Sequence, residues 1–383
     1  MSLVNSVDTI VYKSTESTLS CTVKREMSSD SLDNPKIEKS MVVKGLMPDE
    51  TEFDNDETLS TLSLVCLPDI TNVRLEIMLS RVPNLTSLAL CKLLKITDDG
   101  LTTALEQVKD LRTLHIGHVD SITDRGLQAA ARQLILLDSL RLWYLPNITD
   151  KGLTTTISYC RSLITLFLWQ LPKLTNKGLK TSLSKAKLVR DLTLRDLPCI
   201  DGQGIVDAYQ GKYIRRLVLW NLLEFTDLHL VDLVKVSCTL KELHLKSLEL
   251  LTGKGITRAL TALPTVSGIT SQKLTVLVLD YLKTITSKEL EQILRAVPGL
   301  LNLTLICLPG VRKLKPALIN TTPQLTELHL DAFPNTKIDE IRQIMKAPTK
   351  ANLEILTAYN MDSISKKEMD ILQSEFKSVC IQI

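Results

Sequence analysis

Aromatic residues are scarce in this chain of 383 residues. Phe, Trp and Tyr together make up 4% of it, and only 3 residues are tryptophan, whereas the hydrophobic share reaches 44%. A charged fraction of 23% is ordinary for a folded soluble protein. The core must therefore be built from aliphatic side chains, chiefly leucine.

Signals for membranes, secretion and structural cysteines are also missing. No run of about 18 apolar residues could form a membrane-spanning helix. No apolar segment follows Met1, as a secretory signal would require. The 8 cysteines form no CxxC pair and follow no metal-ligand spacing. We therefore expect reduced thiols, no membrane partner and a cytoplasmic or nuclear location.

The sequence contains no recognisable catalytic signature. It has no phosphate-binding glycine loop, no GxSxG, no HExxH and no paired Cys/His metal motif. His115 and His118 are close in sequence, but no third ligand accompanies them. We therefore predict a protein that is not an enzyme and that uses no metal, no cofactor and no small-molecule substrate.

Charge is unevenly distributed along the chain. Residues 1–58 contain six basic and twelve acidic residues, a net charge of −6, and the remainder carries +9 within an overall charge of +3. The first segment is rich in Ser and Asp and shows little periodicity. We interpret residues 1–58 as an acidic, mostly disordered arm or a partial cap for the domain that follows.

A pattern LxxLxL recurs through the rest of the chain and decides the predicted fold. Its first position falls every 26 residues at Leu59, Leu85, Leu111, Leu137 and Leu163. It continues, with spacings of 26, 25, 26, 34, 26, 25 and 28, at Val189, Ile214, Leu240, Leu274, Leu300, Leu325 and Leu353. This makes twelve repeats. The spacing of 34 contains eight extra residues, around 264–271, which we interpret as a tolerated loop insertion.

Each repeat predicts one strand followed by one helix. The alternating leucines of LxxLxL point inward from a short strand, and the residues between them point outward. A segment such as Ile122-Thr123-Asp124 then begins a helix, with the threonine as N-cap and the acid at the positive helix end. One such unit cannot bury its own apolar face, whereas stacked units can. Residues 59–383 therefore predict an α/β solenoid with a parallel sheet on its concave face and helices on its convex face, closed by a final strand near Val379–Ile383.

The repeat resembles the cysteine-containing subfamily of leucine-rich repeats found in F-box/LRR proteins. The resemblance rests on the 26-residue length, on the ITDxGL segments at 96–101, 122–127 and 148–153, and on Cys160 three residues before Leu163. It covers residues 59 to about 375. No F-box is evident, because residues 1–58 are too polar to supply its leucine-rich helices. The resemblance implies capture of a protein on the concave face and, by analogy alone, a link to ubiquitin signalling.

The repeat phase collects the rare tryptophans on the predicted concave face. Trp143, Trp169 and Trp220 each lie six residues after the first apolar position of their repeat, and Arg195 occupies the same position between the last two. A residue in this phase should point away from the core, so we expect all three tryptophans to be at least partly exposed. Residues in neighbouring outward positions complete the candidate partner-binding set: Arg141, Phe167, Tyr144, His115, Arg216 and Lys246.

Two functional readings of this surface remain open. Tryptophan, tyrosine and arginine dominate binding hot spots, which favours an adaptor or scaffold that recognises a protein or peptide. The alternative is a nucleic-acid-binding protein that stacks bases on aromatic rings, although the acidic residues Asp191, Asp196, Glu242, Asp280 and Asp331 share the face. The tryptophans could also pack on one another as an outward ladder that binds nothing.

Overall fold

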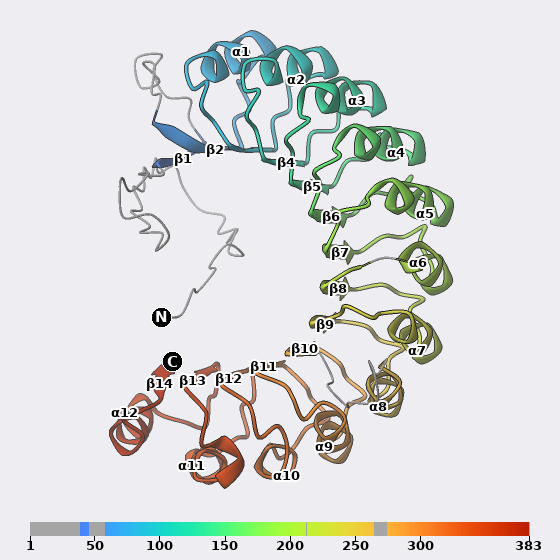
Figure 1. Cartoon of the computed structure of the whole chain (residues 1–383). Helices are drawn as coiled ribbons and strands as arrows, with labels where there is room; N and C mark the ends of the chain where they lie inside the picture. Colours follow the sequence, from blue (N-terminus) through green and yellow to red (C-terminus); the bar gives the residue numbers. More distant parts are fainter. Residues whose placement is uncertain (1–38, 46–57, 212, 264–273, 383) are drawn as a thin grey trace, which may run out of the picture.

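The chain forms a curved solenoid with a parallel sheet on its inner side and helices on its outer side (Figure 1). The computed structural model describes residues 39–45, 58–211, 213–263 and 274–382. The sheet contains 14 strands in strict sequence order. The predicted leucine-rich-repeat architecture is therefore confirmed.

Each of the twelve repeats supplies one strand to the sheet, and one further strand lies at each end. The strands are β1 Lys39–Lys44, β2 Leu59–Val65, β3 Ser87–Cys91, β4 Thr113–Gly117, β5 Ser139–Trp143, β6 Thr165–Trp169, β7 Asp191–Arg195, β8 Arg216–Trp220, β9 Glu242–Lys246, β10 Val276–Asp280, β11 Asn302–Ile306, β12 Glu327–Asp331, β13 Ile355–Tyr359 and β14 Cys380–Gln382. Equivalent leucines are register partners in neighbouring strands, as in the series Leu88, Leu114, Leu140 and Leu166, all of which are buried. Side chains at one repeat position therefore form rows across the sheet.

The helices alternate with the strands and cover the convex side. They are α1 Asn72–Ser80, α2 Asp98–Leu105, α3 Asp124–Gln133, α4 Asp150–Tyr159, α5 Asn176–Lys185, α6 Gly202–Tyr209, α7 Asp227–Lys235, α8 Gly253–Thr261, α9 Ser287–Arg295, α10 Lys315–Ile319, α11 Ile338–Met345 and α12 Lys366–Glu375, with a 3₁₀ turn, η2, at Pro348–Lys350. Each helix packs on its sequence neighbours, and leucine, isoleucine and valine fill the space between helices and sheet.

Both ends of the solenoid are extended by a strand. The predicted closing strand is present as β14, which pairs with β13. At the other end β1 pairs with β2, so part of the segment expected to be mostly disordered is ordered and covers the first repeat. The remainder of the predicted arm, 1–38 and 46–57, and the predicted insertion at 264–271 lie outside the described residues.

A left-handed residue ends every repeat strand. The residue seven after the first apolar position has a positive φ, between 43° and 58°, in all twelve repeats: Cys66, Lys92, His118, Tyr144, Gln170, Asp196, Asn221, Ser247, Tyr281, Cys307, Ala332 and Asn360. In each of these residues except Asn360, the N–H donates to the carbonyl of the last residue of the next strand, as from Tyr144 to Trp169 at 3.0 Å. The turn directs the following leucine inward, so Leu145 and Leu171 are fully buried. None of these residues is glycine, which normally fills such positions.

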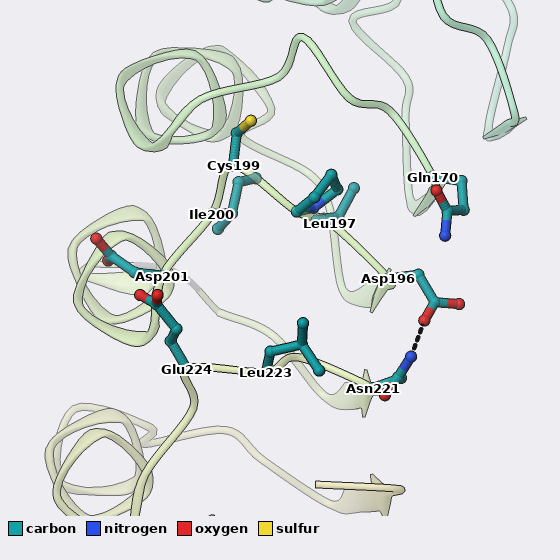
Figure 2. Close-up of a pocket in the computed structure, with 10 residues that line it drawn as sticks. Gln170, Asp196, Leu197, Cys199, Ile200, Asp201, Asn221, Leu223 and Glu224 are labelled. Atoms are coloured by element: carbon teal, nitrogen blue, oxygen red, sulfur yellow. Dashed lines mark hydrogen bonds between the residues drawn. The ribbon is translucent and has the colours of Figure 1, made fainter. Parts of the chain in front are cut away.

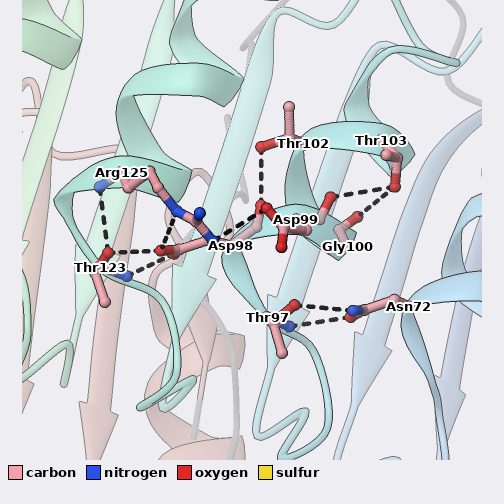
Figure 3. A network of polar contacts seen from close by, with 9 residues as sticks. All are labelled: Asn72, Thr97, Asp98, Asp99, Gly100, Thr102, Thr103, Thr123 and Arg125. Carbon is pink, nitrogen blue, oxygen red and sulfur yellow. Dashed lines mark hydrogen bonds and ion pairs between the residues drawn. The ribbon is translucent and has the colours of Figure 1, made fainter.

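Hydrogen bonds between successive helix starts join the repeats on the convex side (Figure 3). The Asp98 carboxylate accepts from the backbone N–H of Thr123 at 2.8 Å and from its hydroxyl at 2.6 Å. The same pair of bonds joins Asp124 to Thr149 and Asp150 to Thr175. The first residue of one helix thus supports the N-cap of the next, and it satisfies an N–H that a helix start would leave unpaired.

Glycine at the third helical position makes room for this contact. A Cβ at Gly152 would lie 1.9 Å from the Asp124 carboxylate, and a Cβ at Gly178 would lie 1.9 Å from that of Asp150. Gly100, Gly126, Gly204 and Gly255 face Asn72, Asp98, Asn176 and Asp227 in the same way. The side chain of the preceding repeat therefore requires glycine at this position.

Two junctions use the opposite arrangement. Where the helix begins with Gly202 or Gly253, the next helix carries a large side chain at its third position, His229 or Glu289, and that side chain lies over the glycine. Glu289 caps its own helix by accepting from the N–H of Thr286 at 3.0 Å and from its hydroxyl at 2.8 Å. Each junction from α1–α2 to α8–α9 thus has space for one polar side chain, which comes from either the first or the second of the two helices.

A double-mutant cycle at the α3–α4 junction tests this exchange. Gly152→Glu alone should destabilise the fold by at least about 2 kcal/mol, because its side chain meets the Asp124 carboxylate. Asp124→Gly alone should cost about 1–2 kcal/mol through its lost hydrogen bonds. The double variant reproduces the α8–α9 junction and should be more stable than Gly152→Glu alone. Urea unfolding measures the cycle, and equal costs of Gly152→Glu in both backgrounds would contradict the account.

Candidate functional site

The outward residues at the ends of the repeat strands form the candidate site. In-register pairing places Gly117, Trp143, Trp169, Arg195, Trp220 and Lys246 side by side on β4 to β9. Neighbouring strands in a sheet lie about 4.8 Å apart, so consecutive side chains in this row contact one another. The predicted grouping of Trp169, Arg195 and Trp220 is therefore present in the structure.

Arg195 is sandwiched between two indole rings. Its guanidinium carbon lies 3.8 Å from the centre of the Trp169 ring and 3.5 Å from that of the Trp220 ring. Both faces of the guanidinium are thus covered by cation–π contacts. We refer to Trp169, Arg195 and Trp220 together as the Trp–Arg clamp. Lys246 continues the stack, with its Nζ 5.1 Å from the centre of the Trp220 ring.

The carboxylate of Asp196 fixes the geometry of the clamp. Its Oδ2 accepts from Nε1 of Trp169 at 2.8 Å and from Nε of Arg195 at 3.0 Å, and its Oδ1 accepts from the amide of Asn221. Asp196 occupies the left-handed turn after β7, which aims its side chain back along the strand end. Its side chain is only 13% exposed. A largely buried carboxylate with three donors is a strong anchor, because charge-assisted hydrogen bonds are stronger than neutral ones.

Other predicted residues pack around one edge of the clamp. The Tyr144 ring lies edge-on to Trp169, with ring centres 4.7 Å apart, and stacks on His118 at 4.1 Å. The guanidinium of Arg141 lies 5.9 Å from the centre of the Phe167 ring. The structure therefore gathers Tyr144, Phe167 and Arg141 beside the clamp, as the repeat phase predicts.

Trp143 is buried, so the prediction that it is partly exposed is wrong. Its exposed fraction is 4%. The neighbouring position on β4 is Gly117, and a Cβ there would lie 1.9 Å from the indole. The absent side chain leaves a space that the indole fills, and the His115 ring closes it edge-on at 6.4 Å between ring centres. Trp143 therefore acts as a packing residue on the concave side.

The remaining predicted residues are less available for binding. Burial and the charge of Arg141 lower the pKa of His115 to about 3, so its imidazole is neutral at physiological pH. Arg216 pairs with Glu242 at 3.3 Å. Burial raises the pKa of Asp191 and of Glu242 in spite of the nearby Arg216 charge. The positive charges of this face are thus interleaved with carboxylates.

A shallow depression adjoins the clamp where strands lead into helices (Figure 2). It measures about 360 Å³, and the residues that line it include Gln170, Asp196, Asn221, Leu223 and Glu224. Leu223 is 66% exposed. Because Asp196 both holds the clamp and lines this depression, the two form a continuous surface.

The sequence pattern places Asp196 on the outward face but predicts no role for it in the site. Its function depends on the left-handed turn, which reverses the direction of its side chain toward Arg195 and Trp169. A usable signal existed, because Asp and Asn tolerate this conformation better than other residues and both Asp196 and Asn221 occupy the turn. Their recurrence directly after the clamp residues would have identified them.

Comparison with known proteins supports the fold and leaves the site unassigned. No protein-family model and no curated protein sequence matches this chain. A chain in the structure of the yeast Rad7 and Elc1 complex is similar, with 17% sequence identity, a TM-score of 0.57 and coverage of 82% of this chain and 79% of that one. The leucine-rich repeat-containing protein LegL7 from Legionella pneumophila gives 15% identity, a TM-score of 0.51 and coverage of 82% and 99%. The chain therefore has the fold of a leucine-rich-repeat solenoid.

Three further observations concern the described residues only. None of their helices is long and apolar enough to cross a membrane. They contain no group of three or more His, Cys, Asp or Glu side chains placed to hold a metal ion. Their seven cysteines are free thiols.

Alanine substitutions should separate the buried tryptophan from an exposed one. Trp143→Ala should lower the free energy of unfolding by about 3–5 kcal/mol, because it empties the space beside Gly117. Trp220→Ala removes a partly exposed ring and should cost about 1 kcal/mol. Chemical denaturation of both variants measures the difference, and equal losses would show that the two rings have the same structural role.

Acidification should destabilise the concave face through two histidines. Burial, the larger cause, and nearby positive charges lower the pKa of both His115 and His244 from 6.5 to about 3. Between pH 6.5 and about pH 3 the two histidines are therefore protonated in the unfolded chain but neutral in the folded chain. The free energy of unfolding consequently falls as the pH decreases through this interval. Between pH 7 and pH 5 each histidine should cost about 1–2 kcal/mol. A His115→Gln/His244→Gln variant should lose less stability over this interval, and an identical loss would exclude these groups as the cause.

Proposed function

We propose that this chain is a non-enzymatic adaptor that recognises a protein or peptide partner through its concave face. The observation that carries the proposal is the Trp–Arg clamp, in which a guanidinium lies between two partly exposed indoles and Asp196 anchors both the guanidinium and the Trp169 indole. Binding hot spots are rich in Trp and Arg, and side chains ordered before binding lose less entropy when the partner arrives. In this proposal the protein acts in the cytoplasm or nucleus.

The stacked tryptophans have a second possible role as pure structural support. Trp143 fits that description, because it is buried against Gly117. Trp169 and Trp220, in contrast, are partly exposed. They enclose the charged side chain of Arg195, which contributes nothing to an apolar core. A concave surface that keeps a positive charge between two aromatic rings is better suited to recognition than to packing.

A protein partner is favoured over a nucleic acid by the charges of the same face. Arg216 is paired with Glu242, Arg195 with Asp196, and Asp191 and Asp280 lie nearby. A nucleic-acid strand carries a phosphate at every nucleotide and would meet these carboxylates. The similar chain in the Rad7 and Elc1 structure belongs to a complex that contains another protein. A connection of this chain with ubiquitin signalling rests on the family resemblance alone.

Affinity purification with matched variants tests the proposal. The tagged full chain should capture a partner that the Trp169→Ala/Trp220→Ala variant captures at least about 10-fold less, since hot-spot losses reach about 2 kcal/mol. Tyr159→Ala/Tyr213→Ala removes two exposed aromatic rings outside the concave row and serves as the control. Quantitative mass spectrometry measures capture, and thermal melts verify folding. Equal capture by all three proteins would refute binding through the clamp.

The nucleic-acid alternative has its own test. A single-stranded oligonucleotide should bind the full chain weakly and without dependence on Trp169 and Trp220. Tight binding that falls steeply with salt concentration, and that the double alanine variant loses, would support the alternative instead.

A further inference from the structure

The guanidinium of Arg195 is constrained on three sides. Its two faces lie against Trp169 and Trp220, with its central carbon 3.8 and 3.5 Å from the two ring centres. Its Nε donates to Asp196 at 3.0 Å. These contacts restrict the rotation of the guanidinium between the two rings. Only the edge formed by the two terminal nitrogens is left to meet another group.

The terminal nitrogens of Arg195 have no hydrogen-bond acceptor among the described residues. The hydrogen bonds and ion pairs of Arg195 within that part of the chain involve Nε and Asp196 alone. If these nitrogens were buried, they would be polar atoms buried without a partner. No Arg195 atom among the described residues is in that condition, so the terminal nitrogens are accessible to solvent. The side chain as a whole is 23% exposed. The clamp therefore presents a fixed edge of N–H donors on the concave surface.

A fixed guanidinium edge is suited to one kind of ligand group. Two parallel N–H donors match the two oxygens of a carboxylate or phosphoryl group, which allows a bidentate pair. The flanking indoles keep water from the guanidinium faces, and electrostatic attraction is stronger where water is excluded. Because the side chain is already ordered, binding does not require its rotamers to be frozen.

Resting on the proposed function, we infer that the Trp–Arg clamp is a receptor for a single oxyanion, a carboxylate or phosphoryl group, carried by the partner protein. Asp196 leaves the terminal donors of Arg195 unoccupied, and Lys246 adds a positive charge on the far side of Trp220. The depression beside Asp196 offers adjoining surface for the rest of the partner chain. A chain of many phosphates fits less well, because its other phosphates would meet carboxylates. Asp191 lies on β7 together with Arg195, and Glu242 lies on β9.

Indole resonances provide a direct readout with defined probes. The full chain, labelled with ¹⁵N-tryptophan, gives one indole N–H signal from each of its 3 tryptophans. The probes are a blocked tripeptide with a central glutamate, its glutamine analogue, a phosphoserine tripeptide and a single-stranded oligonucleotide. The glutamate peptide, the phosphoserine peptide or both should shift the signals of Trp169 and Trp220, whereas the signal of Trp143 should stay fixed. The two peptides distinguish a carboxylate from a phosphoryl group as the preferred source.

Variants assign the response to the guanidinium edge. Arg195→Lys keeps the charge but loses the planar edge, and it should weaken peptide binding at least about 10-fold. The control is Arg190→Lys, because Arg190 also lies over an aromatic ring, that of Tyr213 at 5.8 Å, but outside the clamp. It should bind as the unmodified chain does. Arg195→Gln provides a second variant if Arg195→Lys alters the indole signals without ligand.

Three results would overturn the inference. They are equal shifts with the glutamine peptide, unchanged binding by both Arg195 variants, and a response to the oligonucleotide alone. The proposed function is tested separately by partner capture. Capture that depends on Trp169 and Trp220, combined with unchanged peptide binding by the Arg195 variants, would leave the adaptor role intact and refute the oxyanion receptor.

Discussion

Contact between successive repeats is the constraint on which this structure depends. A single strand and helix cannot bury its own leucines, so each repeat is stable only against its neighbours. On the concave side, backbone hydrogen bonds between parallel strands hold the register. On the convex side, the first residue of one helix caps the next, and the glycine opposite makes space for it. Both sets of contacts fix the same repeat spacing and so prevent a slip in register.

The same register creates the candidate site. Because every strand pairs at equivalent positions, residues that are 25 or 26 apart in sequence become neighbours across the sheet. Trp169, Arg195 and Trp220 therefore stack without any special loop. The left-handed turn then brings Asp196 to the end of that stack, where it joins two members of the clamp. The structural repeat thus supplies the geometry, and a few side chains in three repeats supply the chemistry of the proposed binding surface.

Sequence periodicity predicts most of the fold, because alternating leucines and helix-start threonines have local physical meanings. It fails where a side chain depends on its neighbour in space. Trp143 occupies an outward position yet is buried, because the glycine next to it on β4 leaves space. Asp196 is a polar residue after a strand, and only the turn conformation reveals that it anchors the clamp. The glycines at helix starts are likewise explained only by a side chain of a neighbouring repeat.

Oxidative footprinting of the tryptophans, alone and in complex with a captured partner, tests the central claim most directly. Trp143 is buried in the free chain and serves as an internal reference. The account predicts that Trp169 and Trp220 are oxidised in the free chain and protected in the complex, while the low oxidation of Trp143 stays unchanged. Equal oxidation of Trp169 and Trp220 in both states, with protection on another surface, would contradict it.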